Sequence, residues 1–284
     1  MKLKGILNFV QRVNNYLPDK LNFDFFRRVI SLCEKNNKFL RISEYETSIP
    51  FKGPLYPRFV HYILYKKSLQ KNRNLGSLFA FRGLDILKYC GLNDGYYVLK
   101  SFINILREKE ISIPYTIVSV EFEKNRIKKF SEYFCFRKID KKLAQILSDF
   151  IGFDKPEFIY ENSRNITFIG IDYFPENNEI LLKLYNKWKF NKKLLYGYER
   201  KFLEKYNLNY VKDLVRTTYI YPDGRFELNK KTHFIFNRKQ KFFEFLKMPL
   251  SKITGPVLKL GVLDKNKIVI SIDKNAFPLE IYIK

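Results

Sequence analysis

The chain has 284 residues, 46% of them hydrophobic and 29% charged, so it can bury a large core and is not disordered by composition. No apolar run approaches the roughly 18 uninterrupted residues that a membrane-spanning helix requires. Residues 1–17 carry an amphipathic pattern, which is typical of a surface helix rather than a signal peptide. We therefore expect one domain over residues 1–284, located in the cytoplasm. Three widely spaced cysteines and two histidines favour neither a disulfide framework nor a zinc site.

The formal net charge of +24 has two interpretations. A cationic surface gains affinity for nucleic acid or another anion through phosphate contacts. However, Lys, Asn, Ile, Phe and Tyr are abundant together, as an AT-rich genome produces without selection for charge. The cations are also dispersed along the chain instead of forming one basic tail or helix.

Turn chemistry and changes of hydrophobic period indicate a repeated unit of one helix followed by a two-stranded hairpin. The turns include Pro222-Asp223-Gly224, where Pro presets φ and Gly accepts a positive φ. In chain order, the expected helices cover residues 23–34, a segment before 115, 141–150, 192–206 and 239–246. The expected strands cover residues 38–46, 58–66, 115–122, 127–136, 165–171, 179–185, 213–221, 225–236, 257–263, 267–272 and 279–283.

Five such αββ units predict an α+β fold with about ten antiparallel strands and all helices on one side of the sheet. A sheet of this size tends to curl and close, because closure removes its edges. We therefore predict a closed ten-strand barrel surrounded by helices. At about ten strands, the interior is wider than side chains can fill, so it should hold a ligand or water.

The order of these units is similar to that of the αββα ("ABBA") aromatic prenyltransferase barrel, and short motifs support the comparison. Ile171-Asp172-Tyr173, a turn and Leu182-Lys183-Leu184-Tyr185 resemble the "DY, turn, VNLYF" hairpin of the bacterial enzymes. Tyr219-Ile220-Tyr221-Pro222 resembles their "SVYP" strand end, and Lys128-Lys129-Phe130-Ser131 lies where they show "KKTY".

Two further segments resemble the cyanobactin peptide prenyltransferases of the same fold family. Arg58-Phe59 is similar to their second-strand "RF", and Phe150-Ile151-Gly152-Phe153-Asp154 to their "LIGFD". The matches are short and cover nearly the whole chain in a shared order.

The resemblance implies an enzyme that moves a prenyl group from an allylic diphosphate, dimethylallyl or geranyl, to an electron-rich aromatic acceptor. The acceptor is a small molecule or a peptide side chain. No aspartate-rich DDxxD segment occurs, so no cofactor is required, although Mg²⁺ can accompany the diphosphate. We expect a monomer, with no membrane span and no nucleic-acid partner.

Such chemistry needs fixed cations for the leaving diphosphate and aromatic walls that exclude water from the carbocation. Glu44 and Tyr219 are the candidate catalytic residues, since Glu44 precedes Arg58 by the spacing seen in the peptide prenyltransferases. The candidate diphosphate ligands are Arg58, Lys129, Lys183, Lys231 and Tyr221, and the cation shield consists of Tyr133, Tyr185 and Tyr282.

The sequence departs from the family pattern at two points. Lys183 replaces an asparagine, and the last strand lacks the lysine found near its start in the aromatic enzymes. Two other functions remain open: a basic nucleic-acid-binding protein and a non-catalytic barrel for a hydrophobic ligand. The latter would have no use for several inward lysines or arginines.

Overall fold

The structure is a computed structural model, and it describes only part of the chain. The described residues are 7, 8, 10, 11, 14, 20–35, 42–48, 51–52, 56–57, 59–66, 75–136, 138–205, 208, 211–237, 267–273 and 280–283. Within these, the side chains of residues 33–79, 82, 267–270 and 280–283 lie outside the description.

Helices and strands alternate along the chain in the expected order. The helices are α2 (Phe23–Lys35), α3 (Leu75–Tyr89), α4 (Asn93–Glu108), α5 (Lys141–Ile151), α6 (Pro156–Glu161), the 3-10 helix η2 (Lys192–Leu194) and α7 (Gly197–Lys205). The strands are β1 (Ile42–Ser48), β2 (Phe51–Lys52), β3 (Tyr56–Pro57), β4 (Phe59–Lys66), β5 (Tyr115–Glu123), β6 (Arg126–Cys135), β7 (Ile166–Phe174), β8 (Glu179–Lys189), β9 (Val211–Ile220), β10 (Phe226–Asn237), β11 (Lys267–Asp273) and β12 (Glu280–Ile283).

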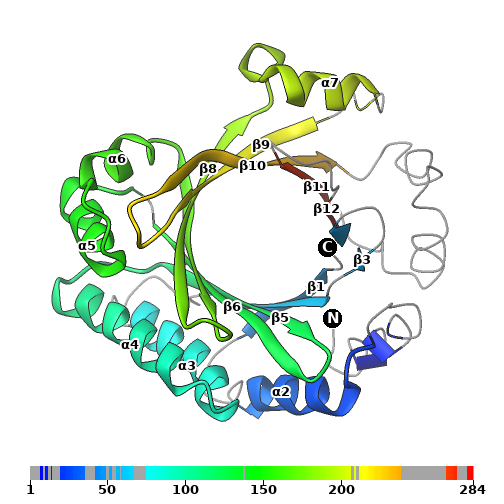
Figure 1. Ribbon diagram of the computed structural model, residues 1–284, viewed down its shortest axis with the longest axis vertical. Helices are drawn as coiled ribbons and strands as arrows, with labels where there is room; N and C mark the ends of the chain where they lie inside the picture. Colours follow the sequence, from blue (N-terminus) through cyan, green and yellow to red (C-terminus); the bar gives the residue numbers. More distant parts are fainter. Residues whose placement is uncertain are drawn as a thin grey trace.

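The strands other than β2 and β3 form one ten-stranded sheet in the order β1-β4-β5-β6-β7-β8-β9-β10-β11-β12, and every pairing is antiparallel. The sheet curls around a central axis, with the helices outside (Figure 1). No ladder joins β1 to β12 among the described residues. The predicted closed barrel is therefore corrected to a strongly curled sheet. Its edge strand β12 has only 4 residues, which offer few backbone groups for a closing ladder.

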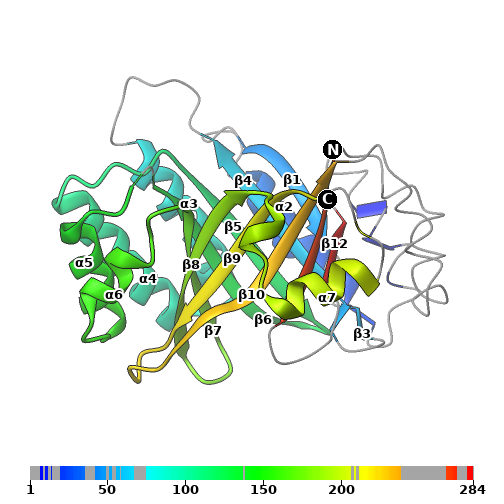
Figure 2. The same ribbon diagram turned by 90° about the horizontal axis from the view of Figure 1, so that it is seen from above.

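The predicted αββ repeat is confirmed in four of its five copies. In the second and third copies, the single helix that we expected is a pair, α3 with α4 and α5 with α6. Figure 2 shows these four helices grouped at one side of the molecule. The expected helix 239–246 and strand 257–263 lie outside the described residues.

Local sequence signals set the ends of these elements. The carboxylate of Asp140 accepts a hydrogen bond from the Leu143 amide at 2.8 Å and caps the start of α5. Gly152 ends the same helix with φ of 70°, a left-handed conformation in which glycine pays no steric penalty. Gly224, with φ of 81°, closes the predicted turn between β9 and β10.

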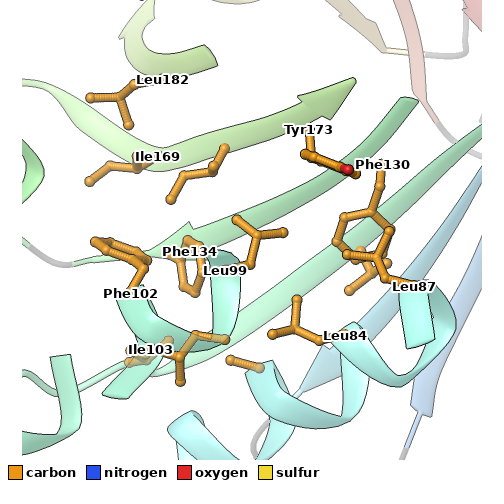
Figure 3. Close-up of a cluster of buried hydrophobic side chains, with 14 of the residues drawn as sticks. Leu84, Leu87, Leu99, Phe102, Ile103, Phe130, Phe134, Ile169, Tyr173 and Leu182 are labelled. Carbon is orange, nitrogen blue, oxygen red and sulfur yellow. The ribbon is translucent and has the colours of Figure 1, made fainter. Parts of the chain in front are cut away.

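The main hydrophobic core lies between the helices and the outer face of the sheet (Figure 3). Leu84 and Leu87 of α3 and Leu99 and Phe102 of α4 pack there against β6, β7 and β8. Phe102 meets Phe134 edge to face at 5.4 Å between ring centres. Successive side chains of a strand point to opposite faces of the sheet, so alternate residues pack against the helices and the others lie on the inner face.

An ion pair between Glu199 of α7 and Arg216 of β9 holds helix α7 against the outer face of the sheet. The guanidinium of Arg216 on β9 contacts Glu199 at 2.7 Å, and Glu199 is fully buried. Arg216 also lies over the Tyr196 ring at 4.0 Å. Among the described helices, none is long and apolar enough to span a membrane.

Candidate active site on the inner face of the sheet

The inner face of β5 to β8 carries a cluster of charged side chains, which we call the inner charge cluster: Glu121, Lys129, Asp172 and Lys183. The neighbours of these residues on each strand, such as Phe130, Ile171 and Leu182, are buried in the core beneath the helices. Strand alternation therefore turns the charged residues to the opposite face. Four consecutive strands, β5 to β8, each contribute one member.

Asp172 is the centre of this cluster and is fully buried. Its Oδ2 accepts a hydrogen bond from Lys183 Nζ and lies 3.3 Å from Lys129 Nζ. Lys129 Nζ also lies 3.5 Å from Glu121 Oε2. Two ammonium groups thus share one carboxylate, which holds both side chains in defined positions on the inner face.

These contacts shift the pKa of each partner. Burial alone would raise the pKa of Asp172, but Lys129 and Lys183 outweigh it and lower that pKa to about 2. Burial alone would lower the pKa of Lys129, but Asp172 and Glu121 raise it well above its usual value. The pKa of Lys183 is lowered to about 8 by burial and by repulsion from Lys129 and Lys231, with Asp172 acting in the opposite direction.

Tyrosine rings line the inner face beside the cluster. Tyr219 lies opposite Lys183 in the β8–β9 ladder, and its ring centre is 4.9 Å from Lys183 Nζ. Tyr133 and Tyr185 meet at 5.8 Å between ring centres. The centre of the Phe168 ring lies 4.7 Å from that of Tyr185 and 5.9 Å from that of Tyr133. Tyr133, Phe168 and Tyr185 thus form one aromatic wall.

Gly170 makes this aromatic wall possible. A Cβ atom at this position would lie 3.0 Å from the Tyr133 ring and 3.2 Å from the Tyr185 ring, both tighter than ordinary van der Waals contact. Tyr133 on β6 lies opposite Gly170, and Tyr185 on β8 lies opposite Phe168, two residues away on β7. Without a side chain on β7 here, both rings can lie over the strand.

The structure describes two further predicted diphosphate ligands, Lys231 and Tyr221. Lys231 on β10 shares the inner face, opposite Thr217 in the β9 ladder, and its charge contributes to the lowered pKa of Lys183. Tyr221 instead follows β9 at the turn, where its hydroxyl donates to Glu227 at 2.6 Å. The predicted contact of Tyr221 with the diphosphate, beside Lys183 and Lys129, stays a prediction.

The side chains of three predicted site residues, Arg58, Glu44 and Tyr282, lie outside the part of the chain that the structure describes. Arg58 lies outside the described residues. Glu44 and Tyr282 lie on β1 and β12, paired with Leu64 and Val269, and their side chains are outside the description.

The sequence interpretation missed four residues of this site: the carboxylates Glu121 and Asp172, the aromatic residue Phe168, and Gly170. Asp172 carried a usable signal, because it alternates with Ile171 and Tyr173 in a strand whose apolar residues face the helices. Glu121 alternates in the same way with Val120 and Phe122. The described residues contain no group of three or more His, Cys, Asp or Glu side chains that could hold a metal ion.

Comparison with solved structures decides the fold. The structure of the prenyltransferase PriB without ligand superposes with a TM-score of 0.64 at 10% identity, covering 100% of this chain and 96% of PriB. The 5-dimethylallyltryptophan synthase from Streptomyces coelicolor superposes with a TM-score of 0.64 at 9% identity, covering 99% of this chain and 97% of the other. This chain has the prenyltransferase-barrel fold.

A third structure of this fold contains ligands. The ternary complex of PriB with L-tryptophan and dimethylallyl thiolodiphosphate superposes with a TM-score of 0.63 at 11% identity, covering 99% of this chain and 95% of PriB. No family model and no curated protein sequence matches the chain. The resemblance that the motifs suggested is thus confirmed by three-dimensional structure, at the level of the prenyltransferase-barrel fold.

Proposed function

We propose that this chain is an aromatic prenyltransferase, which transfers a prenyl group from an allylic diphosphate to an electron-rich aromatic acceptor. The observation that carries the proposal is the placement of Lys129, Lys183 and Lys231 beside Tyr219 on the inner face of a prenyltransferase-barrel fold. The anion site and the aromatic wall that such a reaction needs are thus adjacent.

In the proposed reaction, the bond between prenyl C1 and the diphosphate oxygen breaks, and its electron pair leaves with the diphosphate. Lys129 and Lys183 stabilise the charge that develops on the leaving oxygens, because their ammonium groups are already held in place by Asp172. Tyr219, Tyr133 and Tyr185 present ring faces to the allylic cation and exclude water from it. The acceptor carbon then bonds to C1 and loses its proton.

One comparison supports the choice of substrates. PriB has been solved with L-tryptophan and dimethylallyl thiolodiphosphate, so we propose dimethylallyl diphosphate as donor and an indole or phenol as acceptor, with geranyl diphosphate as the alternative donor. Any Mg²⁺ would be bound through the diphosphate rather than by a protein cage. Since the strands of one sheet supply both the inner charge cluster and the aromatic wall, we propose that the monomer is active.

The inner lysines also argue against a non-catalytic carrier of hydrophobic ligands. Lys183 has a side chain that is only 6% exposed; Asp172 compensates its charge in the free protein, and Lys129 and Lys231 add further positive charge beside it. A purely apolar ligand would gain nothing from this arrangement. A ligand with a diphosphate would.

The test is a panel of dimethylallyl, geranyl and farnesyl diphosphates, each incubated with indole, tryptophan, a phenol and a tyrosyl peptide. Mass spectrometry should detect an acceptor whose mass increases by one prenyl group, together with released diphosphate. Diphosphate release without acceptor would indicate hydrolysis alone. Binding of donors without any reaction across the panel would contradict the proposed activity.

A further inference from the structure

His233 occupies a defined position on the inner face, on β10. Its two neighbours on the strand point toward α7: the Thr232 hydroxyl donates to Glu199 at 2.6 Å, and the Phe234 ring stacks on Phe202 at 5.8 Å. His233 therefore points to the opposite side. There its ring lies 6.0 Å from that of Tyr185, beside the aromatic wall, and it is half-buried.

Two hydroxyl groups hold the His233 ring. Its Nε2 lies 2.8 Å from Thr217 Oγ1 on β9, and its Nδ1 lies 2.5 Å from Ser271 Oγ on β11. Both hydroxyl residues are almost fully buried. A hydroxyl can donate or accept, so it adjusts to the ring by rotating its hydrogen.

This arrangement suits both protonation states of the imidazole. In the neutral ring, one nitrogen donates to one hydroxyl and the other nitrogen accepts from the second. In the imidazolium, both nitrogens donate, and both hydroxyl oxygens accept after one hydrogen rotates. The ring can therefore gain a proton without losing either hydrogen bond, and no heavy atom has to move.

The inner-face carboxylates whose side chains the structure describes are less suitable as proton acceptors, because lysines engage them. Glu121 and Asp172 contact Lys129, and Asp172 also contacts Lys183. Asp213, near the other end of β9, lies 3.1 Å from Lys187 and 3.0 Å from Lys189. An ammonium partner lowers the proton affinity of a carboxylate.

We propose that His233 is the general base of the reaction, receiving the acceptor's proton through the hydroxyl of Thr217. This inference rests on the proposed function. When prenyl C1 has bonded to the aromatic carbon, the C–H bond at that carbon breaks and its electron pair restores the aromatic ring. The proton passes to Thr217 Oγ1, whose own hydrogen moves to His233 Nε2, so that diphosphate and imidazolium are left with the neutral product. The proton then returns to solvent.

Kinetics with matched threonine variants test this role. Thr217→Val removes the relay hydroxyl. Thr218→Val is the control, because Thr218 faces outward and its hydroxyl accepts from the backbone N–H of Asn229 at 3.3 Å. With dimethylallyl diphosphate and indole, His233→Gln should lower kcat about 10²-fold, the range of general base catalysis, with the KM for the donor unchanged. Thr217→Val should lower kcat as well, and Thr218→Val should not.

Ring-deuterated indole separates a base from a packing residue. If loss of the base makes C–H cleavage slow, His233→Gln should show a primary deuterium isotope effect that the wild type lacks. An unchanged kcat in His233→Gln, or a kcat loss without any isotope effect, would overturn the assignment. So would equal losses in Thr217→Val and Thr218→Val.

A second measurement does not depend on turnover. The chain has two histidines, so ¹⁵N NMR of the ring nitrogens, with His61→Gln used for assignment, reports the state of His233 directly. The proposal requires a neutral ring at about pH 7.5, with one protonated and one unprotonated nitrogen. An imidazolium in the resting protein would overturn it. The two proposals can fail separately. If the wild type prenylates no acceptor of the panel, the proposed function fails. A neutral His233 ring whose ¹⁵N signals shift in Thr217→Val would still support the hydrogen-bonded arrangement that can accept a proton.

Discussion

The ammonium of Lys183 lies 4.9 Å from the centre of the Tyr219 ring on the neighbouring strand. A ring face that attracts an ammonium also attracts a carbocation, because both interact with the negative face of the π system. Tyr219 and Lys183 therefore bring together the two interactions that the proposed reaction needs: one for the allylic cation and one for the departing diphosphate.

Removing one inner lysine should reduce activity. Lys129→Ala should lower kcat/KM by roughly 30- to 150-fold, because it removes a charge-assisted contact to the leaving group worth about 2 to 3 kcal/mol. Lys128→Ala is the matched control: the adjacent lysine carries the same charge but contacts Glu123 at 2.7 Å near the strand end. Equal effects of the two variants on kcat/KM would show that net charge, and not position, matters.

Lys183→Ala should reduce both activity and stability, because Lys183 is one of the two cations that compensate the buried Asp172. We expect a loss of about 1 to 3 kcal/mol in the free energy of unfolding, measured by urea denaturation. The double variant Lys183→Ala/Asp172→Asn should recover stability but not activity. Recovery of both would place Lys183 outside the diphosphate site.

Binding of inorganic pyrophosphate should depend on the charge of Lys183. Burial lowers its pKa to about 8 in the free protein, with Asp172 opposing this shift and Lys129 and Lys231 adding to it, so Lys183 loses its proton as the pH rises through this value. A bound anion favours the charged form, so binding near pH 8 should take up protons and should weaken toward about pH 9.

Isothermal titration calorimetry in buffers of different ionisation enthalpy measures this proton uptake. Lys183→Arg is the control, because arginine keeps its charge over the whole range and leaves only the titration of pyrophosphate itself. The wild type should take up more protons than the variant. Identical uptake would mean that pyrophosphate does not approach Lys183.

The sequence predicted the repeat and the antiparallel order well, because these depend on local periodicity and turn chemistry, whereas the roles of the lysines at the diphosphate stay a prediction. Lys183 lies between Leu182 and Leu184, and this pattern alone predicts that it faces away from the core. Closure of the sheet was not predictable in the same way, since it depends on long-range pairing of β1 with β12. The carboxylate partner of Lys183 was missed because Asp172 lies 11 residues away and meets it only across a strand pair.

Tyr221 shows a different limit of sequence reasoning. The motif comparison assigned it to the diphosphate. In the structure it lies one residue beyond the end of β9, and its hydroxyl donates to Glu227, a partner that the motif did not indicate. A residue's place in a short motif therefore says less about its contacts at a strand end than within a paired strand.

Gly170→Ala should disturb the aromatic wall. The new methyl group would lie 3.0 Å from Tyr133 and 3.2 Å from Tyr185, so both rings would have to move. We expect a loss of about 1 to 3 kcal/mol in stability and a lower kcat, because the displaced rings would shield the cation less well. Gly197→Ala is the control, since no atom lies within 4 Å of its added Cβ. A thermal midpoint lowered as much by Gly197→Ala as by Gly170→Ala would contradict this explanation.

Glu132 should limit the stability of the folded chain. It is fully buried on the outer face, between Val118 and Ile171 of the neighbouring strands, and neither carboxyl oxygen has a hydrogen-bond partner among the described residues. Burial raises its pKa well above the usual value, so the folded protein favours the neutral acid. A buried polar group without a partner costs about 1 to 3 kcal/mol.

Glu132→Leu should therefore raise the free energy of unfolding by about that amount, and the gain should increase with pH. The sign follows from linkage: above pH 4.5, the usual pKa of the carboxyl, the unfolded chain ionises Glu132 freely while the folded chain resists, so the wild type loses stability as the pH rises. Glu132→Gln should remove the pH dependence but only part of the cost, because the amide still lacks a partner. Urea denaturation from about pH 5 to about pH 8 measures both effects, with the exposed Glu179→Leu on β8 as the control. A pH-independent difference between wild type and Glu132→Leu would mean that Glu132 is ionised in the folded protein and has a partner that compensates its charge.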